Sequence, residues 1–174
     1  MFDSERISQR LQSLNELYND AFADNLELAE LYSKIAVIEL GGWSEEVRDY
    51  LSLLLFNKIY CDSSNEYYSK MFERPVSGFD YKKHFRNRVF EKMIGVHGAD
   101  EIERCIDTGV LEQFRGALGQ LWEMRNKCAH QTLENTMGSQ QAPSMTISQF
   151  AKIRRGFEEF EKAIDSLERV VIRL

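Results

Sequence analysis

The chain has 174 residues, of which 43% are apolar and 29% are charged, and its net charge is −6. This length is enough for one domain with a real hydrophobic core, and we expect a single domain over residues 1–174. The acidic balance excludes a protein that coats nucleic acid with its whole surface, because such proteins are usually basic. Any contact with nucleic acid must therefore come from a local patch.

Neither a membrane anchor nor a disulfide framework is predicted. No run approaches about 18 uninterrupted apolar residues, and the polar, acid-containing N-terminus is not typical of a signal peptide. The three cysteines, Cys61, Cys105 and Cys128, are widely spaced and odd in number, which is not the pattern of a disulfide scaffold. We expect a cytoplasmic protein with no membrane contact.

Helical periodicity runs along most of the chain, and no segment alternates with the period of two that marks a strand. Only two prolines interrupt it. The polar segment 134–145 contains Gly and Pro and is predicted to be a loop. The pattern predicts an all-α fold, an antiparallel bundle of four or five main helices. Helices are expected over residues 4–20, 24–60, 63–74, 79–98, 99–107 and 108–130, and from Thr146 to the C-terminus. Capping boxes mark the starts at 24 and 63, and Thr146 caps the last helix. The alternative for the second helix is a kink at 41–42.

The stretch "RNKCAH" at residues 125–130 closes the helix expected over 108–130. Leu111, Phe114, Leu118 and Leu121 form an apolar stripe along this helix, and Arg125 extends it. A guanidinium keeps its proton, so it needs a carboxylate, a phosphate or a path to water. His130 lies five residues further on, roughly 140° around an ideal helix, so the two side chains meet only if the helix ends or distorts there.

This stretch resembles the Arg-x4-6-His motif of HEPN domains. Asn126 directly after the Arg and Ala129 directly before the His match residue preferences of that family. The family is an all-α bundle with the motif before a loop and a last core helix, which agrees with the predicted order. The resemblance covers most of the chain as architecture but only about six residues as motif.

The resemblance implies a metal-independent endoribonuclease that works as a homodimer, with two motifs in one cleft. It assigns His130 as general base or acid, Arg125 as the clamp on the transition-state phosphate, and Asn126 as a positioning group. Imidazole titrates near neutral pH and guanidinium binds phosphate in planar, bidentate geometry. The implied products carry a 2′,3′-cyclic phosphate and a 5′-hydroxyl.

Thr132 stands where HEPN toxins paired with nucleotidyltransferase antitoxins usually carry a tyrosine. This departure argues against control by nucleotide transfer onto that position. It leaves open other HEPN branches, including toxins with a different antitoxin or a defence-system partner. It also leaves open two alternatives: a catalytically inactive HEPN-like scaffold that binds RNA or protein, and an unrelated bundle in which the Arg pairs with an acid and the His caps helix carbonyls.

Two further groups are candidates for the site. Glu39 lies in the apolar run "IAVIELGGW" and is the expected acid partner of Arg125, since a carboxylate in such a run needs a partner unless it faces solvent. The run "YKKHFRNR" at 81–88 is the clearest basic patch, with Tyr81 and Phe85 as candidates to stack on bases. The alternative is the solvated face of an amphipathic helix. The expected RNA-binding cations are Lys82, Lys83, Arg86, Arg88 and, within the motif, Lys127.

The sequence predicts no metal and no cofactor. The histidines and cysteines lack the paired spacing of zinc ligands, and no glycine-rich phosphate loop is present. Cys128 is expected to be a small buried residue. Gly116 and Gly119, three apart on one helix, are candidates for a close helix approach, for example across a dimer interface.

Overall fold

The computed structural model describes residues 2–59, 78–130 and 141–167. Every regular element in this part of the chain is a helix, so the all-α prediction is confirmed. The predicted helix over 63–74 lies outside the described residues. The described helices are α1 (Glu5–Phe22), α2 (Leu26–Ile59), the π-helix η1 (Tyr81–Phe90), α4 (Glu91–Arg104), α5 (Thr108–His130) and α6 (Pro143–Ser166).

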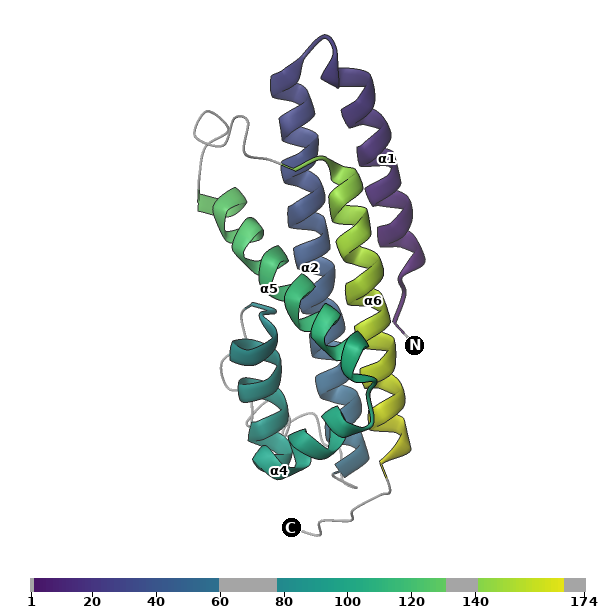
Figure 1. Cartoon of the computed structure of the whole chain (residues 1–174), viewed down its shortest axis with the longest axis vertical. Coiled ribbons are helices and arrows are strands. Elements are labelled where there is room, and N and C mark those ends of the chain that lie inside the picture. Colours follow the sequence, from purple (N-terminus) through teal and green to yellow (C-terminus); the bar gives the residue numbers. More distant parts are fainter. Residues whose placement is uncertain (1, 60–77, 131–140, 168–174) are drawn as a thin grey trace.

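α2 is the longest of these helices, and the others are arranged around it (Figure 1). α1 and α6 lie along it, and they also contact each other. α5 packs on α2 and α6 and crosses them obliquely, while η1 and α4 lie beside the lower half of the bundle (Figure 1). None of the described helices is long and apolar enough to cross a membrane.

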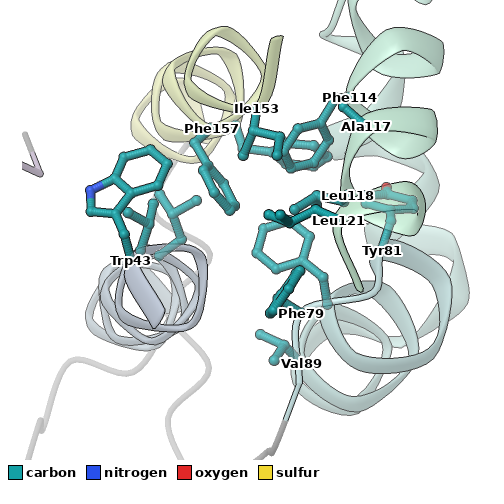
Figure 2. Close-up of a cluster of buried hydrophobic side chains, with 14 of the residues drawn as sticks. Trp43, Phe79, Tyr81, Val89, Phe114, Ala117, Leu118, Leu121, Ile153 and Phe157 are labelled. Carbon is teal, nitrogen blue, oxygen red and sulfur yellow. The ribbon is translucent and has the colours of Figure 1, made fainter. Parts of the chain in front are cut away.

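One cluster of buried side chains draws on all six helices. The predicted stripe of α5 is buried in this cluster, where Phe114 meets Phe157 of α6 with ring centres 5.0 Å apart. Figure 2 shows Ile153 and Phe157 of α6 facing Phe114 and Ala117 of α5, with Trp43 of α2 on the other side. Burial of large aromatic side chains is the main driving force for such packing.

Glycine sets the closest approach in this core. A Cβ placed on Gly156 of α6 would lie 2.2 Å from Cδ2 of Phe114. Gly116 and Gly119 of α5, predicted to permit close approach, face open space instead, because a Cβ on either would have nothing within 4 Å. Within this chain the close contact between α5 and α6 therefore depends on Gly156.

The ends of several helices differ from the sequence prediction. α2 begins one residue after Asn25, whose side chain accepts from the Leu28 N–H at 3.0 Å, so the cap is Asn25 and not Asp24. It then runs through Gly41 and Gly42 as one helix. α6 begins at Pro143 rather than Thr146, which is buried. A proline at the first turn is preorganised for a helix, and this moves the start three residues into the predicted loop.

The helix predicted over 79–98 differs from the prediction in two ways. Its first half is the π-helix η1, in which the Phe85 N–H donates to the Asp80 carbonyl five residues earlier. Asp80 also caps this helix by accepting from the Lys83 N–H at 2.8 Å. Its second half is broken at Gly95, which lies inside α4 with φ 70° and ψ 173°. A residue with a side chain rarely adopts this conformation.

Candidate functional site at the end of α5

α5 carries the three motif residues on different sides of its last turns. The helix is unbroken from Thr108 to His130, so Arg125 and His130 remain about 140° apart around it. His130 is exposed at the last position, and Asn126 is partly buried. The side chains of both form no hydrogen bond with a described residue. Within one chain the structure does not bring Arg125 and His130 together.

Arg125 lies against α2 at a glycine. A Cβ on Gly41 would be 3.0 Å from Cγ of Arg125, so the missing side chain makes room for the stem of the arginine. On α5 itself, the guanidinium carbon lies 5.9 Å from the ring centre of Trp122, three residues earlier. The Arg125 side chain remains 33% exposed. Packing along the stem with an exposed head is the usual compromise for a long cation.

Among the described residues, the carboxylate paired with Arg125 belongs to Glu45. Its Oε1 lies 4.0 Å from Nη2 of Arg125 and accepts the N–H of Gly78 at 3.1 Å. The two side chains are 33% and 30% exposed, so this long ion pair is a weak one. The guanidinium is therefore oriented by a carboxylate but not neutralised by close, bidentate pairing.

The prediction that Glu39 holds Arg125 is wrong. Glu39 forms an ion pair with Arg10 of α1. It precedes Gly41 by two residues, which is about 200° around the helix, so it faces α1 while Gly41 faces α5. Glu45 follows Gly41 by one turn and shares its side of α2. The apolar run around Glu39 led to the wrong acid being assigned to Arg125. The position of Glu45 four residues after Gly41 would have identified it as the residue on the same side of α2.

Beneath Arg125, the turn before η1 packs tightly against Trp122. Gly78 has φ 93°, and a Cβ there would lie 2.6 Å from Trp122 and 2.8 Å from His84. Its carbonyl accepts from Nη1 of Arg48, a buried residue of α2. Gly78 is therefore fixed by Glu45 at its N–H and by Arg48 at its carbonyl. Neither Trp122 nor Gly78 was among the residues predicted from the sequence.

His84 is buried against Trp122, with ring centres 4.8 Å apart. Its Nδ1 accepts the Asp80 N–H at 3.1 Å, so the ring is neutral with its proton on Nε2. Burial lowers the pKa of His84, and the positive charge of Arg88 lowers it further, while Asp80 acts in the opposite direction. His84 therefore has a structural role in the candidate site, where it packs against Trp122.

The basic run 81–88 is only partly available to a ligand. Tyr81 and Phe85 are buried in the core, so the prediction that they stack on bases is wrong. The hydroxyl of Tyr81 donates to Glu103. Arg86, another of the predicted RNA-binding cations, pairs with Glu91 at 2.9 Å and with Asp100 and Glu103 at 2.5 Å each, so carboxylates already balance its charge. The hydrogen bond to Asp100 raises the pKa of Arg86 further above its ordinary value.

The other predicted cations are exposed. Lys82 lies with Arg86 at a pocket of about 540 Å³, and Lys127 lies on the exposed side of α5. Lys83 and Arg88 are exposed as well. The pocket is lined mainly by Asp80, Lys82, Arg86, Asn87, Glu91 and Arg115.

Two other predictions concern Cys128 and metal binding. Cys128 is buried, as predicted. In the described ranges, His, Cys, Asp and Glu side chains form no group of three or more that could hold a metal ion. Comparison of the chain with protein-family models, with curated proteins and with solved structures gave no match.

Proposed function

We propose that this chain is a metal-independent endoribonuclease of the HEPN type, with its site at the end of α5. The observation that carries the proposal is the state of Arg125: its stem is fixed against Gly41, its head is partly exposed, and Glu45 lies no closer than 4.0 Å. A guanidinium kept in place and left without a close partner is suited to bind a phosphate. The exposed His130 at the end of the same helix supplies an imidazole.

The proposed reaction is an internal transfer at phosphorus. The 2′-oxygen of a ribose forms a bond to the adjacent phosphorus, and the bond from phosphorus to the 5′-oxygen breaks. The proton of the 2′-hydroxyl goes to a general base, and a general acid protonates the departing 5′-oxygen. His130 is the base or the acid, and Arg125 stabilises the negative charge on the phosphorus oxygens. Asn126 is a positioning group for either partner.

The angle between Arg125 and His130 on α5 determines how such a site must be assembled. The two side chains diverge on an unbroken helix, so one chain does not place both on one phosphate. We therefore propose a homodimer in which the motifs of two copies face each other and each phosphate meets the arginine of one chain and the histidine of the other. A two-fold dimer creates two such half-sites by symmetry.

The same divergence favours one alternative, a bundle that binds RNA or a protein without cutting it. In that case Arg125 and His130 would act independently of each other. Loss of either residue would then change binding without any change in the covalent state of the RNA. The two functions are distinguished by the products and not by affinity.

The test is RNA cleavage by the purified protein in EDTA, with wild type beside His130→Ala and Arg125→Ala. We expect fragments with 2′,3′-cyclic phosphate ends, and losses of about 10²–10⁴-fold for the histidine variant and about 10²–10³-fold for the arginine variant. The matched controls are His97→Ala on α4 and Arg155→Ala on α6, both exposed, which are expected to cut like wild type. RNA that stays intact with wild type contradicts the proposal.

Mixing the two inactive variants tests the composite site. A mixed dimer regains one complete half-site, the one that combines the arginine of one chain with the histidine of the other. With random subunit exchange, about a quarter of the wild-type activity should return. No recovery after demonstrated exchange would mean that each active site uses both residues of one chain.

A further inference from the structure

The basic residues of η1 are divided between two faces by its π-helical geometry. Residues four and five apart lie on the same side of a π-helix, because its hydrogen bonds join residues five apart. Lys82 and Arg86, four residues apart, therefore share one side, and both line the same pocket. Arg88 follows Lys83 by five residues and His84 by four, so it lies on the same side as each of them. An α-helix would have separated Lys83 from Arg88, so this pairing was not visible in the sequence.

The side with Lys83 and Arg88 is continuous with the candidate site. His84, which lies between them in the sequence, contacts Trp122 at 4.8 Å between ring centres. The guanidinium carbon of Arg125 in turn lies 5.9 Å from the ring centre of Trp122. We call this surface the η1–α5 face; it consists of Lys83, His84 and Arg88 of η1 with Trp122 and Arg125 of α5.

The charges of Lys83 and Arg88 reach the buried histidine. After burial, Arg88 is the largest contribution to the lowered pKa of His84, and Lys83 acts in the same direction. The opposing charge is Asp80 at the start of η1, and Arg48 of α2 adds a further positive charge. Both cations therefore lie near His84, the residue of η1 that contacts Trp122.

These two cations differ from Arg86 in having no acid partner in the part of the chain that the structure describes. Within the described ranges, the side chains of Lys83 and Arg88 form no ion pair and no hydrogen bond. Arg86, which lies between Lys83 and Arg88 in the sequence, forms ion pairs with three carboxylates. Cations without an acid partner among the described residues repel one another and attract a polyanion, even in a chain with net charge −6.

We propose that the η1–α5 face is the track for a single-stranded RNA, with successive phosphates on Arg125, Arg88 and Lys83. The identity of the strand rests on the proposed function, whereas the position of the track rests on the geometry of η1. Three cations are few for a duplex, whose binding usually needs more phosphate contacts. A flexible strand can instead follow the surface from α5 onto η1 and offer bases to the exposed part of Trp122.

The experiment measures binding of a fluorescent 12-nucleotide oligouridine at several salt concentrations, using the full chain with His130→Ala so that no cleavage occurs. The test variant adds Lys83→Gln and Arg88→Gln. The matched control adds Lys152→Gln and Arg155→Gln, which remove the same charge from exposed positions of α6. Loss of two phosphate contacts should lower the salt slope by about 1.4 and weaken binding roughly 10- to 30-fold near 0.1 M salt. The control should keep the slope.

Each outcome decides between the track and the proposed function. If wild type cuts no RNA but the test variant alone loses binding, the track stands and the nuclease proposal fails. If wild type cuts RNA and the test variant binds like the control, the track is wrong and the nuclease proposal stands. Equal competition by duplex RNA, or by polyglutamate of equal charge, would also overturn the track, since the face would then not select a single strand. Circular dichroism checks that both variants fold.

Discussion

Gly41 of α2 and Arg125 of α5 are in such close contact that a Cβ on the glycine would lie 3.0 Å from Cγ of the arginine. The same Cβ would lie 3.2 Å from the ring of Phe79. Gly42, the next residue, has nothing within 4 Å of its corresponding position. Two adjacent glycines of one helix therefore have different roles, and only Gly41 sets the position of Arg125.

Gly41→Ala is expected to reduce RNA cleavage with little effect on stability. The methyl group displaces the stem of Arg125 by a few tenths of an ångström, whereas alanine favours the helix over glycine by about 0.5–1 kcal/mol and offsets the crowding. Cleavage rates and urea unfolding of Gly41→Ala and Gly42→Ala provide the comparison. Equal cleavage by the two variants would show that Arg125 tolerates this displacement or has no role in the reaction.

Glu45→Gln tests the acid that the structure assigns to Arg125. The amide keeps an acceptor for the Gly78 N–H but loses the charge that orients the guanidinium. We expect cleavage to fall about fivefold, which corresponds to about 1 kcal/mol, the upper range for a partly exposed ion pair. Glu39→Gln, which breaks the pair with Arg10, is the matched control and should cut like wild type. A larger loss in Glu39→Gln than in Glu45→Gln would reverse the assignment.

His84 should make the protein less stable in mild acid. Its folded-state pKa is lowered below 6.5 by burial and by Arg88, so the unfolded chain binds this proton more readily than the folded one. The free energy of unfolding should therefore fall as the pH falls below about 6.5, by at most about 1.36 kcal/mol per pH unit.

His84→Asn is the variant that isolates this effect, since its side-chain oxygen can still accept the Asp80 N–H. Urea unfolding between pH 5 and pH 7.5 should show a smaller pH dependence for His84→Asn than for wild type. Glu103 and Asp100, whose pKa values are lowered below those of ordinary carboxyls, titrate in more acidic solution and do not interfere. An unchanged dependence in His84→Asn would place the titrating group elsewhere.

Gly156→Ala and Gly116→Ala should change stability in opposite directions. The Cβ on Gly156 would lie 2.2 Å from the Phe114 ring, so α5 and α6 must move apart, at a cost of about 1–3 kcal/mol. Gly116 has open space around it, and alanine there should stabilise α5 by about 0.5–1 kcal/mol. Thermal unfolding of the two variants is the measurement. A destabilising Gly116→Ala would indicate that this face is covered in solution, as a dimer interface would cover it.

Much of the fold followed from local patterns. α5 begins at the predicted residue, Thr108, because its apolar stripe is regular and an aspartate caps its start. The start of α6 was misplaced because a proline can begin a helix as well as interrupt one. The π-helix was missed for a similar reason, since its apolar residues at 81, 85, 89 and 90 also fit an α-helical stripe.

By itself, the sequence determined the helices, their buried stripes, and Arg125 and His130 as the candidate residues. These follow from the order of residues along one helix. Only the tertiary structure decided that Glu45 and not Glu39 faces Arg125, and that Arg86 is neutralised while Lys83 and Arg88 remain unpaired among the described residues. Charge pairing depends on which side of a helix each residue occupies and on which helix packs there, and both are fixed by contacts between residues far apart in the chain.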